Sequence, residues 1–148
     1  MGKHKIETVY LDAKIEIVSL VSEGEVRALR RAFHNKKKKQ FTDACFEICL
    51  AGTRGAERNA LLGQLRTFEK HHILPLSFGG TNDFENLVLI DPKLHLQIHQ
   101  LMAIFTRRQQ CHVAGSSVYL PVPRHPQKER IWGLNYTFIR VEDFDLAA

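Results

Sequence analysis

The sequence contains few cysteines, and their spacing suits neither a metal ribbon nor a disulfide framework. The three cysteines, Cys45, Cys49 and Cys111, are odd in number and include no C-x-x-C pair. This argues against a cysteine zinc ribbon and against a disulfide-rich secreted scaffold. Cys45 and Cys49 share a helical face, so we expect free thiols that pack in a core within a reducing compartment.

Long apolar runs are lacking as well. The N-terminal segment Met-Gly-Lys-His-Lys is charged and is followed by no long apolar stretch. We therefore expect neither a secretory signal peptide nor a membrane span, and no membrane partner. The expectation is a soluble protein that acts in the cytoplasm, and delivery into another cell would need a route without a cleavable signal.

The charge balance favours a polyanionic partner. Lysine and arginine number 21 against 16 acidic residues, which gives a net charge of +5. Such an excess suits nucleic acid without identifying it. Part of the excess lies in Lys36–Lys39, which we interpret as a solvated loop rather than a binding patch. The length fits one domain with its own core, so residues 1–148 are expected to form a single domain.

The hydrophobic pattern predicts helices and strands mixed along the chain. Ser22-Glu23-Gly24-Glu25 is a capping box that should open a helix, and the lysine run should interrupt this helix. A second helix is expected to begin at Thr42 and to end near Gly52. A weaker helix is expected over 57–65, and strands are expected over 6–21, 117–122 and 135–141. Pro121 and Pro123 should confine the middle one of these strands to a sheet edge.

Three elements are predicted in succession in the middle of the chain. They are a strand, a return strand after a glycine-containing loop, and a helix, over residues 67–73, 87–90 and 92–106. Asp91 is a good N-cap and Pro92 suits the first helical position, so together they predict where this helix begins. The domain then consists of an N-terminal strand and helix region, this core, and a β-rich C-terminal extension, at 1–65, about 66–106 and 107–148.

Four of the eight histidines lie in this core: His71, His72, His95 and His99. His95 and His99 are four residues apart on the predicted helix, so their imidazoles lie on one face and can share a cation. A hairpin that packs on the helix would bring His71 and His72 opposite them. The set predicts a three-histidine metal site with an open position, and one further histidine for proton transfer.

Simpler explanations apply to the histidines taken one at a time. A single histidine on an amphipathic helix is usually a surface residue or a satisfied core residue. For the whole set, the strongest alternative is a structural zinc site. Such sites normally close with four ligands and favour cysteine, and none of the three cysteines lies in this stretch.

The run FEKHHILPLSFGGTNDFENLVLIDPKLHLQIH, Phe68–His99, resembles the HNH or ββα-metal nucleases. The shared features are paired histidines, a proline, a Gly-Gly loop, the triplet ENL and a helix with H-x-x-x-H. With Glu69 before the paired histidines, the run is most similar to the nuclease domains of DNase-type colicins and S-type pyocins. The resemblance implies an α+β fold in which a ββα-metal (HNH) motif is embedded in a small mixed domain. It also implies metal-dependent hydrolysis of phosphodiester bonds.

The resemblance further implies a role for each histidine. His72 would be the general base that takes a proton from the attacking water. One divalent cation would be held by His71, His95 and His99. Three imidazoles favour zinc, nickel or cobalt in affinity, whereas magnesium or manganese would support turnover. Since neighbours on a regular strand point to opposite faces, we expect irregular backbone over 71–74, with Pro75 ending the strand.

Other residues would support these histidines. Asn86 would fix the loop and orient His72 through a hydrogen bond, and its simplest alternative role is to cap a turn. Glu69 would be a partner for a metal ligand or an arginine. Arg66 or Lys93 would contact phosphate, and the alternative for both is a role in solubility alone.

Several functions are compatible with these expectations. The leading one is a DNA endonuclease with little sequence specificity, either an antibacterial toxin with an acidic immunity protein or a phage, mobile-element or defence nuclease. The toxin domains end soon after their last histidine, whereas this chain continues. The resemblance therefore does not imply that the whole protein is a bacteriocin. RNA is the less favoured substrate. A catalytically silent, metal-stabilised nucleic-acid-binding module would have no need of His72 as a base.

Overall fold

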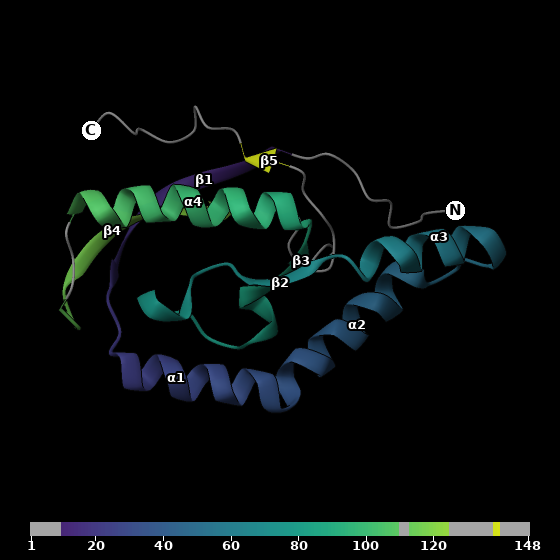
Figure 1. Cartoon of the computed structure of the whole chain (residues 1–148), viewed down its shortest axis with the longest axis horizontal. Helices are drawn as coiled ribbons and strands as arrows, with labels where there is room; N and C mark the ends of the chain where they lie inside the picture. The colour runs from purple at the N-terminus through teal and green to yellow at the C-terminus, as the bar shows by residue number, and fades with distance from the viewer. Residues whose placement is uncertain (1–9, 110–112, 125–137, 140–148) are drawn as a thin grey trace.

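The computed structural model describes residues 10–109, 113–124 and 138–139 (Figure 1). The elements in chain order are β1 (Tyr10–Ser19), α1 (Glu23–Ala32), the π-helix η1 (Phe33–Lys37), α2 (Lys38–Leu50), α3 (Gly55–Leu65), β2 (Glu69–His72), the 3-10 turns η2 (Leu76–Phe78) and η3 (Phe84–Asn86), β3 (Leu87–Ile90), α4 (Pro92–Gln109), β4 (Ser117–Arg124) and β5 (Phe138–Ile139). The predicted mixed α+β class is confirmed. Cys111, the start of the first expected strand and most of the strand expected over 135–141 lie outside the described residues.

The N-terminal helices begin and end close to the predicted signals. The Ser22 hydroxyl accepts a hydrogen bond from the amide of Glu25 at 3.3 Å, so α1 begins at the capping box. At its far end, α2 stops at Leu50, shortly before Gly52, whose φ of 77° places it in the left-handed region. The weaker helix predicted over 57–65 is α3.

The expected break at the lysine run is wrong. The helix continues from α1 through η1 into α2, which begins within the run and before Thr42. Lysine is a good helix former, and two of these lysines have partners in the folded chain. Lys39 forms an ion pair with Asp43 at 2.7 Å, and Lys37 lies 4.9 Å from the centre of the Phe84 ring. The run is therefore a structured helical segment.

The predicted strand, strand and helix unit is present. β2 and β3 form an antiparallel hairpin in which His71 lies opposite Val88. The Asp91 side chain accepts a hydrogen bond from the amide of Lys93 at 2.7 Å, as expected of the residue that caps α4. Pro92 is the first residue of that helix.

The strand β3 is buried on both faces and separates two hydrophobic clusters. Its alternate residues point to opposite sides, as the pleat of a strand requires. Toward α4 and β4 the cluster contains Ile73, Val88, Ile90, Ile98, Met102, Leu120 and Val122. Toward α2 and α3 it contains Phe33, Phe41, Cys45, Cys49, Leu50, Leu65, Phe68, Leu87 and Leu89. The hairpin is thus fixed from both sides.

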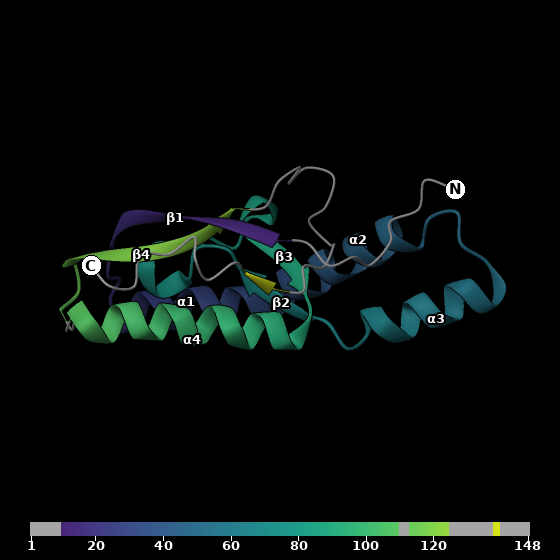
Figure 2. The ribbon, with the colours of Figure 1, turned by 90° about the horizontal axis from the view of Figure 1, so that it is seen from above.

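A second sheet packs on α4. Its strand order is β4-β1-β5, with β4 antiparallel and β5 parallel to β1. β4 therefore lies at the edge that Pro121 and Pro123 predict. The Gln109 side chain at the end of α4 donates to the Tyr119 carbonyl at 2.6 Å and accepts from the Tyr119 amide at 2.7 Å. Figure 2 shows α4 running along this sheet.

The two long helical segments lie on opposite sides of the β2–β3 hairpin, with α4 on one side and α1 on the other (Figure 1). This arrangement leaves the outer edge of β2 between them. Among the described residues, no helix is both long and apolar enough to cross a membrane.

Candidate metal centre and active site

A cleft of about 660 Å³ runs along the edge of β2 between α1 and α4. Its floor includes Phe68–His72, one wall carries His95 and His99 of α4, and the opposite wall carries Arg30 and His34. In the described part of the chain, β2 pairs with β3 alone, so its other edge borders the cleft. Side chains from both faces of β2 can therefore reach the same space.

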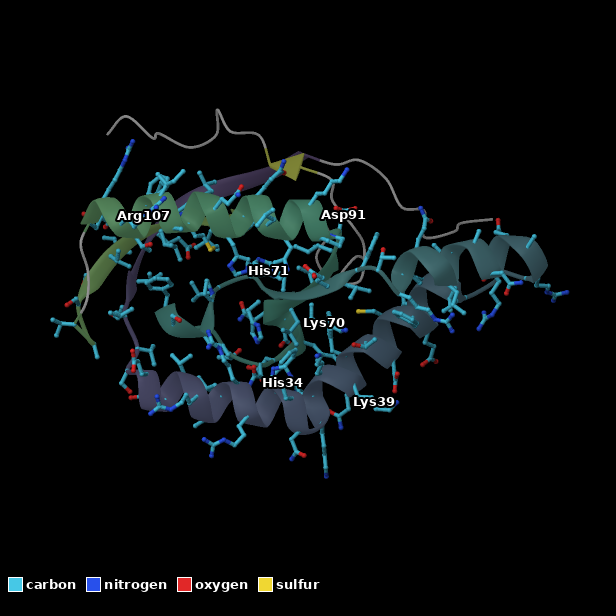
Figure 3. The ribbon with its side chains drawn as sticks, in the orientation of Figure 1. His34, Lys39, Lys70, His71, Asp91 and Arg107 are labelled. Atoms are coloured by element: carbon cyan, nitrogen blue, oxygen red, sulfur yellow. The ribbon has the colours of Figure 1, made fainter. Side chains whose placement is uncertain are left out.

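The regular alternation of β2 divides its side chains between the two walls. His71 points to α4, where its ring centre lies 5.1 Å from that of His95 (Figure 3). His72 points to α1, where its ring centre lies 4.8 Å from that of Phe33. The irregular backbone expected over 71–74 is wrong for the two histidines, because His72 still pairs in the ladder with Leu87. It is confirmed for residues 73–74, which form a bend after the strand has ended and before Pro75. The strand stays regular, and the cleft wraps around its edge.

His71, His95 and His99 bring their imidazoles together. One ligand nitrogen from each lies within 4.8 Å of the other two, and the Nε2 atom of His71 is buried. The Nε2 atoms of His95 and His99 are 2.9 Å apart. Without a cation, two facing imidazole nitrogens need a proton between them, whereas a shared cation accepts a lone pair from each. The donor set therefore fits a divalent metal ion.

Glu69 fixes the orientation of one of these imidazoles. Its Oε1 atom accepts a hydrogen bond from Nδ1 of His95 at 2.8 Å, which leaves Nε2 of His95 as the nitrogen with a lone pair. The expected role of Glu69 beside a metal ligand agrees with this contact. Burial lowers the pKa of His99, and the nearby charge of His95 lowers it further. The neutral form, which a metal ligand requires, is favoured.

His72 is held separately by Asn82. The Asn82 amide nitrogen donates to the Leu29 carbonyl at 2.9 Å, so its Oδ1 atom is the acceptor that faces His72. Nε2 of His72 lies 2.9 Å from that oxygen and donates to it, which leaves Nδ1 as the basic nitrogen. Burial is the main cause that lowers the pKa of His72, so the neutral imidazole is favoured.

Asn86 fixes the loop but does not contact His72 as expected. Its Oδ1 accepts from the Leu74 amide at 2.9 Å, and its Nδ2 donates to the carbonyls of Leu74 at 2.9 Å and Thr81 at 2.8 Å. Gly80 lies against this clamp, because an added Cβ would be 1.8 Å from the Leu74 carbonyl oxygen. Both the amide oxygen and the amide nitrogen of Asn86 are thus bonded to the loop backbone and not to the histidine.

The basic residues of the site differ from those expected. Arg66 is exposed at the end of α3 and Lys93 is exposed at the start of α4, and neither lines the described cleft. The cleft instead carries Lys70, with a pKa lowered chiefly by burial and further by the charge of Lys38. The wall formed by the first helix had a sequence signal, which was the four-residue spacing of Arg30 and His34. The loop expected at the lysine run concealed this signal. Asn82 had no such signal, because its contact with α1 arises only from packing.

Comparison with known proteins identifies the segment that builds this site. Residues 54–100 match the family model of HNH endonucleases. Over 36 residues the chain is 47% identical to the probable mobile endonuclease C of Enterobacteria phage T4, a match that covers 24% of this chain and 17% of that protein. No solved structure matches significantly. The histidine cluster therefore lies within the segment, residues 54–100, that matches the HNH endonuclease family model.

Proposed function

We propose that the chain is a metal-dependent endonuclease that hydrolyses phosphodiester bonds in DNA with little sequence specificity. The observation that carries this proposal is the division of the histidines around β2. His71, His95 and His99 face one another, whereas His72 is held apart by Asn82 on the other side of the same cleft. A structural metal site needs no such fourth histidine, but a hydrolase needs a base beside its metal.

The metal site is proposed at His71, His95 and His99. Three imidazole ligands leave an open coordination position, as catalytic sites do. A divalent cation bound there supplies Lewis-acid stabilisation of the negative charge on a phosphate and its leaving oxygen. Zinc, nickel or cobalt would bind these nitrogens tightly, and magnesium or manganese remains the proposed alternative for turnover.

His72 is the proposed general base. Its Nε2–H donates to Asn82, so Nδ1 carries the lone pair that takes a proton from the attacking water. The lowered pKa keeps this nitrogen unprotonated at neutral pH. Asn86 contributes indirectly by holding the loop that carries Asn82, and Glu69 by orienting His95.

DNA is the proposed substrate, with RNA less favoured. The HNH endonuclease match and the net charge of +5 support a nucleic acid. The sequence contains no recognisable base-reading module, so contacts to the phosphate backbone should dominate, and these carry little sequence information. Arg66 does not line the cleft, so its contact with phosphate stays a prediction and would involve DNA that extends beyond the cleft.

We further propose that residues 1–148 act as one domain, since β3 contributes to both hydrophobic clusters. The printed name of the phage relative favours a mobile-element or phage nuclease as the biological role. An antibacterial toxin with an acidic immunity protein, on the pattern of colicins and pyocins, stays a prediction of the sequence resemblance alone.

The test is cleavage of supercoiled plasmid by the purified chain, with EDTA and with a panel of divalent metals. We expect nicked and linear products with one or more metals and none with EDTA. Cleavage sites should be spread over many sequences. A metal-saturated protein that leaves plasmid DNA intact, or that cuts only RNA, would refute the proposed activity.

A further inference from the structure

We propose that Arg30, His34 and Lys38 form a phosphate-binding wall that holds the DNA strand in the cleft opposite the metal ligands. These three residues are called the basic wall below. The inference rests on the proposed function and names the part of the chain that binds the substrate backbone. The basic wall lies outside residues 54–100, so the match to HNH endonucleases does not assign it.

The geometry of the first helix places the three side chains in one row. They follow one another at intervals of four residues from α1 through η1 into α2, and all three line the cleft. Four residues advance a helix by roughly 6 Å, so the row spans about 12 Å. Phosphates advance by about 3.4 Å along the axis for each strand of DNA, so the row matches a few consecutive phosphates.

The basic wall also lies beside the proposed base. The ring centre of Phe33 is 5.6 Å from that of His34 and 4.8 Å from that of His72. Asn82 adds a second connection, because it bonds both His72 and the Leu29 carbonyl of the same helix. A strand held by the wall is therefore held next to His72.

Two other cations of this helix, which do not line the cleft, have carboxylate partners. Away from the cleft, Arg27 lies 3.9 Å from Glu23, and Lys39 lies 2.7 Å from Asp43. Within the described residues, no carboxylate forms an ion pair with a member of the basic wall. Arginine and lysine that line a cleft without carboxylate partners are suited to bind an anion. A phosphodiester backbone supplies such anions in a row.

The test is DNA binding without cleavage, measured by fluorescence anisotropy with a short labelled duplex in EDTA. The variant is Arg30→Gln/Lys38→Gln, and the control is Arg27→Gln/Lys39→Gln, which removes the same charge from the same helix. For two phosphate contacts, the slope of log affinity against log salt should flatten by about 1.8, and affinity at 0.1 M salt should fall by roughly tenfold or more. His34→Gln should weaken binding less, because the glutamine amide keeps a hydrogen-bond donor at this position.

The outcomes separate this inference from the proposed function. A wall variant that melts like the parent and keeps the parent's affinity and salt slope overturns the basic wall, even if the parent cuts DNA. Equal losses in the wall and control variants overturn it too, because they would reflect net charge alone. A parent that binds only an RNA probe of the same sequence overturns the assignment to DNA. Weaker binding of the wall variant alone supports the wall, even if no cleavage is found.

Discussion

At His72 the orientation of a single amide decides which ring nitrogen carries the proton. Asn82 donates through Nδ2 to the Leu29 carbonyl and must therefore accept through Oδ1 from Nε2 of His72. An imidazole fixed in this tautomer keeps its lone pair on Nδ1, and His72 lines the cleft. Removing the amide would let the ring rotate and change tautomer without touching the metal ligands.

We therefore predict that Asn82→Ala lowers kcat by about 10- to 100-fold, the usual range for a residue that orients a functional side chain. Zinc affinity, measured by calorimetry, should stay at the parent's value because no metal ligand contacts Asn82. Asn59→Ala, a change on the exposed surface of α3, is the control. A fall in zinc affinity equal to the fall in kcat would show that Asn82 acts through the metal site instead.

Gly80 offers a second prediction at the scale of one residue. A Cβ at this position would lie 1.8 Å from the Leu74 carbonyl oxygen and 2.9 Å from Nδ2 of Asn86. Gly80→Ala should therefore displace the loop and lower the free energy of unfolding by about 1–3 kcal/mol or more. The control is Gly63→Ala in α3, where nothing lies within 4 Å of the added Cβ. That substitution should raise stability by about 0.5–1 kcal/mol. Thermal melts that rank the two variants in the reverse order would contradict this account.

How far the sequence predicts the site depends on the kind of contact. His95 and His99 could be paired from their spacing, because a helix fixes the positions of residues four apart. The partner of His72 could not be predicted, since Asn82 and His72 meet only when the loop packs against α1. Asn86 was the expected partner because the resemblance to HNH nucleases implies that role. Its donors and acceptor are engaged by the loop backbone instead.

Among the elements, α4 and the hairpin were predictable and the long N-terminal helix was not. Asp91 and Pro92 give a local start signal, and β3 has buried residues at every position. The lysine run has no comparable local signal, because solvated loops and helix surfaces both favour lysine. Its helical state depends on long-range contacts such as Lys37 over the ring of Phe84.

The buried face of α2 makes its two cysteines unreactive. Burial raises the pKa of the Cys49 thiol to about 11, and it raises that of Cys45 still further, with the charge of Cys49 as the next cause. At pH 8 only about one Cys49 thiol in a thousand is then the reactive thiolate, and the fraction for Cys45 is smaller still. We predict slow alkylation of both residues in the native protein, and fast alkylation in denaturant, by mass spectrometry of iodoacetamide-treated samples. Rapid native alkylation of Cys45 or Cys49 would contradict their burial in the cluster with Phe41.

For the whole molecule, the proposed metal site connects elements that are distant in the chain. His71 comes from the hairpin, whereas His95 and His99 come from α4, so the three ligands meet only in the folded protein. Metal binding should therefore stabilise folding, by about 2.7 kcal/mol when the free metal is 100 times the Kd. We predict that zinc raises the Tm of the parent and that His99→Ala largely removes this rise. Gln100→Ala, on the exposed surface of the same helix, should keep it. An unchanged zinc affinity in His99→Ala would show that the ligand set is wrong.

The division of labour between His71 and His72 is the central claim, and one measurement on His72→Ala tests it most directly. Plasmid cleavage by this variant is followed at a zinc concentration where calorimetry shows the site to be filled. We predict zinc binding like that of the parent and a cleavage rate lower by about 10²-fold or more, the scale of a lost general base. His71→Ala should instead lose zinc affinity as well as activity. A His72→Ala protein that fails to bind zinc, or that cuts plasmid at the parental rate, would contradict the account.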